Sequence, residues 1–107
     1  MRNLLEGLVG EAEAERVDVL LARPGLRIER ILSTGQASPP GFWYDQPQDE
    51  WVVVIAGRAA LEIEGEGERT LGPGDFVHLP ARLRHRVAWT SPAEPTVWLA
   101  VHFAAGV

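Results

Sequence analysis

The chain has 107 residues, a formal net charge of −5, no cysteine and no lysine, since all ten basic residues are arginines. This length predicts one domain with a modest core. The missing residue types exclude disulfides, thiolate sites and Schiff-base chemistry, and the acidic balance argues against a nucleic-acid partner.

The start of the chain shows no basic region followed by a long apolar run, so it does not have the pattern of a secretory signal. No window holds the ~18 consecutive apolar residues of a membrane span. We therefore expect a cytoplasmic protein with no membrane partner.

Residues 1–16 are expected to form an N-terminal helical or extended segment. Asn3 is a suitable helix cap, and leucines and a valine follow it at helical spacing, which predicts a short helix within residues 3–16. The rest of the chain, residues 17–107, is expected to form one β domain.

Short alternating or apolar runs, separated almost everywhere by glycine or proline, continue from residue 17 to the end. Strands are predicted at residues 17–22, 26–34, 42–46, 51–56, 59–64, 69–71, 75–79, 85–90 and 96–103. Many short strands at regular spacing favour an all-β sandwich or barrel over alternating strands and helices.

Two spaced motifs lie within this β region. Glu50 is followed by six residues, WVVVIA, and then Gly57. Further on, five residues separate Gly74 from Pro80 and four separate Pro80 from His85, and Gly74 itself belongs to the turn-forming sequence LGPGD. In this order and spacing, the two patterns resemble the two sequence motifs of the cupin superfamily, and the resemblance covers about the last two thirds of the chain.

The chain departs from the cupin pattern at four positions. Two histidines one residue apart would precede the glutamate, but Tyr44 and Gln46 occupy these positions. Arg82 stands in place of a glycine and Trp89 in place of an asparagine. The resemblance implies a single-domain cupin jelly-roll β-barrel, similar to small bacterial cupins of unassigned function, and it places Glu50 and His85 inside the barrel near its open end.

In the jelly roll that the resemblance implies, the strand carrying residues 97–103 should run antiparallel beside the strand that begins at Glu50, which would bring His102 close to this carboxylate. Strand alternation from His85 places Trp89 on the same face, so Trp89 is expected to line the pocket. The resemblance implies the same for Tyr44 and Gln46, which occupy the positions of the two histidines. By the same alternation, His78 is expected to face away from the site.

Two interpretations of this site remain open. In one, Glu50, His85, His102 and Gln46 bind one divalent transition metal (Fe, Mn, Zn or Ni), because imidazole and carboxylate are ligands for these ions. In the other, no metal binds and Glu50 and His85 are a catalytic acid–base pair or hydrogen-bond partners.

The corresponding functions are a metal-assisted enzyme that acts on a small organic molecule, of dioxygenase or isomerase type, and a metal-free small-molecule-binding cupin, a sensor or carrier. A small-molecule ligand is expected in both cases. Trp51, Val53 and Ile55 leave an apolar stripe on the face opposite Glu50, so we also expect a homodimer that covers an exposed edge strand and an apolar outer face.

Overall fold

The computed structural model describes residues 2–10 and 14–105, and within them the protein is all-β with no helix. No helix in this part of the chain could therefore cross a membrane. The eight strands are β1 (Arg16–Arg23), β2 (Leu26–Ser33), β3 (Asp49–Ala56), β4 (Ala59–Ile63), β5 (Gly67–Leu71), β6 (Phe76–Leu79), β7 (His85–Thr90) and β8 (Thr96–Phe103). They correspond to eight of the nine strands expected from the sequence.

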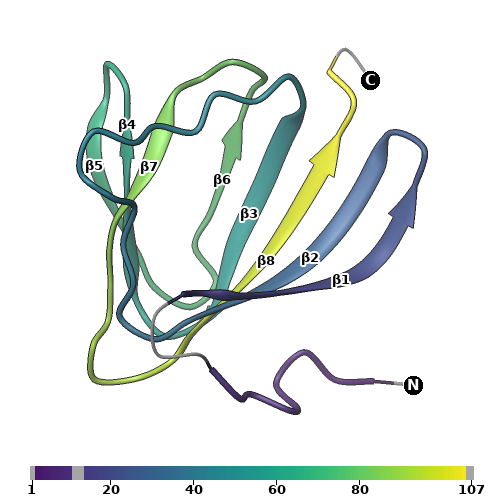
Figure 1. The fold of residues 1–107 in the computed structure, drawn as a ribbon, viewed down its shortest axis with the longest axis vertical. Helices are drawn as coiled ribbons and strands as arrows, with labels where there is room; N and C mark the ends of the chain where they lie inside the picture. Colours follow the sequence, from purple (N-terminus) through teal and green to yellow (C-terminus); the bar gives the residue numbers. More distant parts are fainter. Residues whose placement is uncertain (1, 11–13, 106–107) are drawn as a thin grey trace.

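The strands form two antiparallel sheets, a five-stranded sheet in the order β1-β2-β8-β3-β6 and a three-stranded sheet in the order β5-β4-β7. In Figure 1 the long strands of the large sheet fan out from the small sheet. The expected all-β architecture is thus present, in the form of two sheets. The named strands do not close into one continuous barrel, because no strand of one sheet pairs with a strand of the other.

The core lies between the two sheets and follows from the alternation of side chains along each strand. On β3, Val52 and Val54 point inward from the same face as Glu50, and they are 4% and 0% exposed. Leu61 of β4 and Trp98 of β8 complete the same buried cluster. The indole nitrogen of Trp98 donates a hydrogen bond to the Ser33 hydroxyl at 3.1 Å, so the only polar atom of this large ring is satisfied inside the core.

The predicted N-terminal helix is wrong within the described residues. Asn3 does cap a turn, because its side-chain oxygen accepts from the Leu5 amide at 2.8 Å and its carbonyl accepts from the Glu6 amide at 3.2 Å. The turn ends at Gly7, whose φ is +63°. The Arg30 guanidinium then donates to the Leu4 and Glu6 carbonyls at 3.1 and 2.6 Å, which ties the segment to β2 instead of leaving these oxygens for helical hydrogen bonds.

The predicted strand at residues 42–46 is also wrong. Only Tyr44 makes a β-bridge, to His85. The neighbouring prolines offer no amide donor and Gly41 has a φ of +79°, so the segment cannot continue a ladder. It forms part of a long connection between β2 and β3 that crosses beside β7 (Figure 1).

Gly57 ends β3, and two constraints require glycine there. Its φ is +88°, and a Cβ atom added at this position would lie 2.5 Å from the Pro95 carbonyl oxygen and 2.6 Å from the Thr96 Cα. The glycine of the first motif therefore allows the turn after β3 to pack against the start of β8.

We predict that Gly57→Ala lowers the free energy of unfolding by about 3 kcal/mol, through backbone strain and overlap with backbone atoms. Gly65→Ala is the matched control, because Gly65 also has a positive φ, +82°, but an added Cβ meets nothing within 4 Å. It should cost only about 1 kcal/mol from the left-handed conformation. Urea unfolding measures both, and equal losses would show that the close approach to β8 is unimportant.

Candidate functional site

A cavity of about 290 Å³ opens between the two sheets. Its apolar lining residues include Val52, Leu61, Val87 and Trp98, and eight polar residues also line it. Those polar residues are Glu15, Arg27, Glu29, Tyr44, Gln46, Glu50, His85 and His102. The cavity therefore combines an apolar surface with ionisable groups from several strands, which is the usual composition of a small-molecule site.

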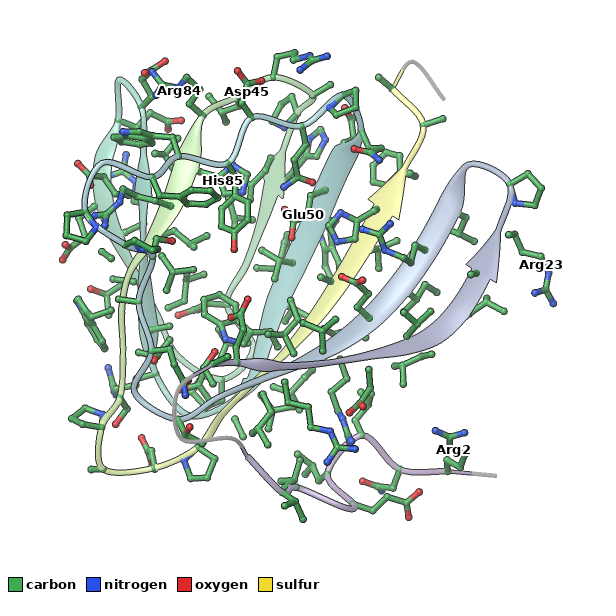
Figure 2. All side chains as sticks on the ribbon, viewed as in Figure 1. Arg2, Arg23, Asp45, Glu50, Arg84 and His85 are labelled. Atoms are coloured by element: carbon green, nitrogen blue, oxygen red, sulfur yellow. The ribbon has the colours of Figure 1, made fainter. Side chains whose placement is uncertain are left out.

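Glu50 and His85 come from different sheets and lie next to each other in the lining of the cavity, as Figure 2 shows. The His85 Nε2 lies 3.4 Å from the Glu50 Oε1, and the two side chains are only 7% and 11% exposed. The Nδ1 of His85 contacts the Leu83 carbonyl at 3.0 Å, which fixes the ring and turns Nε2 toward the carboxylate. Two buried groups that can exchange a proton thus meet at the cavity wall.

The surroundings of His85 change its pKa in opposite directions. Burial lowers the pKa, but the hydrogen bond to Glu50, the hydrogen bond to the Leu83 carbonyl and the negative charge of Glu50 together raise it above the ordinary value for histidine. A larger share of His85 is therefore protonated near neutral pH than of an exposed histidine.

Tyr44 and Gln46 reach the cavity from the connection between β2 and β3. The Tyr44 amide donates to the His85 carbonyl at 2.7 Å, and the two rings stack with centroids 5.3 Å apart. The Gln46 carbonyl accepts from the Arg82 amide at 2.7 Å, and the Gln46 side chain lies 3.4 Å from the Glu50 Oε1. Arg82 has a φ of +67°, so the position where the cupin motif has glycine does require the left-handed conformation.

Arg86 holds this connection against β7. Its guanidinium donates to the Ser38 carbonyl at 2.9 Å and to the Phe42 carbonyl at 3.3 Å, and it also contacts Glu62 at 3.3 Å. The Val87 amide donates to the Ser38 hydroxyl at 2.9 Å. These contacts position a segment that has almost no ladder hydrogen bonds, and with it the Tyr44 and Gln46 side chains.

His102 lies beside Glu50, as the antiparallel register predicts, since the two are direct partners on β8 and β3. Its Nε2 is 4.0 Å from the Glu50 Oε2 but only 3.1 Å from the Glu29 Oε1. The other oxygen of Glu29 accepts from the Arg27 Nε at 2.8 Å. A second buried histidine–carboxylate pair therefore stands next to the first.

Trp89 is the one expected pocket residue that the structure does not bring to the cavity. A β-bulge on β7 separates Val87, which pairs with Leu61, from Trp89, which pairs with Ala60. Leu61 faces the cavity and its neighbour Ala60 faces the opposite side of the sheet, so Trp89 does as well. The alternation from His85 fails at this inserted residue. His78 does face away from the site, where it is half exposed and contacts Asp49 at 3.3 Å.

Arg27, Glu29 and Glu15 are functional candidates that the motif analysis did not identify. Arg27 and Glu29 alternate on β2 with residues of the outer face, and β2 pairs with β8 so that Arg27 lies opposite His102. The sequence could have indicated both residues. A residue opposite His102 on the neighbouring strand, and the residue two positions along that strand, have side chains on the same face as His102. Glu15 precedes the first strand, and no pattern pointed to it.

The cupin resemblance implies a divalent metal ion bound by side chains of this cavity. No three His, Asp or Glu side chains in residues 2–10 and 14–105 are arranged to hold a metal ion. Burial, with the charges of Glu15 and Glu50, raises the pKa of Tyr44, so its phenol remains neutral and is a poor ligand. Gln46 offers only a neutral amide, and the His102 Nε2 is engaged by Glu29. Glu50, His85, His102 and Gln46 as arranged here do not fit a metal centre.

Comparisons with known proteins agree with this fold. The family model described as "Cupin domain" matches residues 30–102. A crystal structure from Ralstonia eutropha, of a protein described as a "putative mannose-6-phosphate isomerase", is 57% identical over 98% of both chains, with a TM-score of 0.95. No protein of curated function matches the sequence.

Two more distant structures share the fold. A Thermus thermophilus protein is 19% identical over 98% of this chain and 97% of its own, with a TM-score of 0.80. A cupin superfamily protein from Desulfitobacterium hafniense is 15% identical over 97% of this chain and 91% of its own, with a TM-score of 0.77. With a family match across residues 30–102 and a 57% identical relative, the chain belongs to the cupin family.

Proposed function

We propose that the cavity binds a small organic molecule and that Glu50 and His85 act on it as an acid–base pair of isomerase type. The observation that carries this proposal is the buried contact of 3.4 Å between the two groups at the cavity wall. The description of the Ralstonia eutropha relative as a "putative mannose-6-phosphate isomerase" supports the reaction class.

The chemistry of the pair suits the movement of a proton between neighbouring carbons of a hydroxy-carbonyl compound. The Glu50 carboxylate would remove the proton on the carbon next to the carbonyl, while protonated His85 gives its Nε2 proton to the carbonyl oxygen. The resulting enediol would then accept the proton from Glu50 on the former carbonyl carbon. Neutral His85 would take back a proton from the other hydroxyl oxygen, so that both groups regain their starting states.

The surrounding residues support these roles. The Leu83 carbonyl fixes the orientation of the His85 ring, and the stacked Tyr44 ring covers one face of it. The raised pKa of His85 keeps the acid available near neutral pH. The apolar wall around Val52 and Trp98 limits access of water to the reacting atoms.

A metal-free sensor or carrier is the second candidate. The observation in its favour is the apolar share of the cavity lining, with Val17, Ile31 and Trp98 among its residues, which would hold a ligand without any reaction. This candidate uses the same cavity but requires no proton transfer, so measurement of exchange separates the two.

We predict that the wild-type protein exchanges deuterium from D₂O into one or more members of a panel of small hydroxy-aldehydes and hydroxy-ketones. The exchange occurs at the carbon next to the carbonyl and is measured by proton NMR. Glu50→Gln should slow this exchange by at least about 100-fold, because the amide cannot act as a base. Glu68→Gln, at an exposed carboxylate of β5 that does not line the cavity, should leave the rate unchanged. Full exchange in Glu50→Gln contradicts the proposed base, and ligand binding without exchange identifies a binding protein.

We predict that protein purified without an affinity tag contains well below one equivalent of Fe, Mn, Zn or Ni, because one carboxylate and one available imidazole hold these ions weakly. Elemental analysis of the wild type, His85→Ala and His102→Ala measures this, with His78→Ala as the control at an exposed histidine. Near-stoichiometric metal that is lost in the two cavity variants, but kept in His78→Ala, would contradict the acid–base proposal and restore the metal-assisted one.

We further propose that the protein is a homodimer through the edge strand β1. Four apolar residues of this strand, Val17, Val19, Leu20 and Leu21, are 37 to 56% exposed, and one edge of β1 has no paired strand among the described residues. If two copies pair antiparallel about an axis between Leu20 and Leu21, Asp18 of each lies opposite Arg23 of the other. Opposite charges at both ends and apolar side chains at the centre would stabilise this pairing.

We predict that light scattering at micromolar concentration gives the mass of a dimer for the wild type. Leu20→Lys should give a monomer, because a charge at the centre of the strand opposes edge pairing. Val9→Lys is the control, since Val9 is an apolar residue outside β1 that is even more exposed, at 68% against 38% for Leu20. A monomeric wild type, or a dimeric Leu20→Lys, contradicts the β1 interface.

A further inference from the structure

Negative charge exceeds positive charge in the cavity. Its lining contains the carboxylates of Glu15, Glu29 and Glu50, and among the described residues Arg27 is the one lining residue with a permanent positive charge. Arg27 is engaged by Glu29 at 2.8 Å and His85 by Glu50 at 3.4 Å. Each of these two carboxylates thus has its own cationic partner within the site.

Glu15 is the carboxylate that remains without a cationic partner among the described residues. Burial raises the pKa of this carboxyl group, and a hydrogen bond to Ser33 lowers it. The nearby negative charges of Glu29 and Glu50 also raise it, so that the pKa lies above its ordinary value. The three carboxylates therefore lie close enough to repel one another. A positive charge in the cavity would relieve this repulsion, whereas an anion would add to it.

His102 supplies an independent observation in favour of a ligand that donates hydrogen bonds. The side chain lines the cavity and is only 7% exposed, yet its Nδ1 has no hydrogen-bond partner within the part of the chain that the structure describes. Since Glu29 as a carboxylate can only accept, the Nε2 of His102 donates to it at 3.1 Å. In the neutral ring Nδ1 is then an acceptor, and an unsatisfied buried acceptor calls for a donor.

We propose that the ligand of this cavity is a small organic cation that carries an ammonium group. The inference rests on the proposed role of the cavity as a ligand site, and it specifies the chemical class of that ligand. The ammonium group would supply N–H donors and a positive charge to the carboxylates and to His102. The apolar part of the ligand would pack on Ile31 and Trp98, and Tyr44 and Trp98 offer aromatic faces that attract cations.

The same arrangement disfavours a phosphorylated sugar. A phosphate dianion would require cationic or donor groups, but the guanidinium of Arg27 already bonds Glu29, and Glu15 and Glu50 would repel the ligand. For this chain we therefore expect the amino group, and not a phosphate, to determine which molecules bind.

The test compares matched amines, alcohols and carboxylates of two to six carbons, together with mannosamine, mannose and mannose 6-phosphate, by ligand-observed NMR and thermal shift at neutral pH. The ammonium member of a series should bind about tenfold more tightly than its alcohol, and the carboxylate and the phosphate should show no binding. Added salt should weaken the ammonium binding only. Binding of no amine, or tighter binding of the alcohol, carboxylate or phosphate, overturns the proposal.

Glu15→Gln is the decisive variant, because it removes the unpaired charge without changing the Glu50–His85 pair or a residue of any strand. It should lower the affinity for the ammonium member by about tenfold and leave that for the alcohol unchanged. Glu68→Gln, at an exposed carboxylate outside the cavity, should change neither. If Glu15→Gln binds the ammonium compound as tightly as the wild type, the Glu15 carboxylate is not the group that attracts the ligand, and the proposal is overturned.

Binding is measured here without turnover, so the two proposals fail separately. Ammonium binding without any deuterium exchange counts against the acid–base function alone. Exchange on neutral sugars with no preference for amines counts against the organic cation alone.

Discussion

The register of β8 against its two neighbours determines where the polar and apolar parts of the cavity lie. His102 stands opposite Glu50 of β3 on one side and opposite Arg27 of β2 on the other. Two residues away along β8, Ala100 stands between Val52 and Glu29, so a small side chain leaves room for Glu29 to reach His102. A shift of one residue would turn this whole row to the outer face, because side chains alternate along a strand.

The next inward residue of β8 continues the pattern into the core. Trp98 lies between Val54 of β3 and Ile31 of β2, and this apolar row closes the cavity below the polar one. Charged side chains thus give way to apolar ones over the four residues from His102 to Trp98 of β8 and over the residues opposite them on β2 and β3. The same strands that build the core hold the ionisable groups, which is why the buried charges have fixed partners and do not simply face water.

Much of this arrangement could be predicted from the sequence, because it depends on features that alternate or repeat. The strands follow from apolar alternation, and the proximity of Glu50 to His102 follows from the strand pairing of the jelly roll that the two motifs imply. The prediction failed where a single local event overrides the pattern. One extra residue on β7 turns Trp89 away from the cavity, and Arg30 binds the carbonyls that an N-terminal helix would have used. Glu15 reaches the cavity from outside any strand, so alternation could not identify it.

The substitutions at Tyr44 and Gln46 connect the fold to the proposed chemistry. Where the cupin motif has two histidines, this chain has a neutral phenol and a neutral amide, so two metal-binding groups are lost while the Glu50 carboxylate remains. A buried carboxylate needs a positive or hydrogen-bonding partner, because its solvation by water has been removed. His85 supplies one for Glu50 and Arg27 one for Glu29, but Glu15 has only the Ser33 hydroxyl. The proposed cationic ligand would meet this remaining charge, in a cavity where the family's metal ion would otherwise balance the carboxylates.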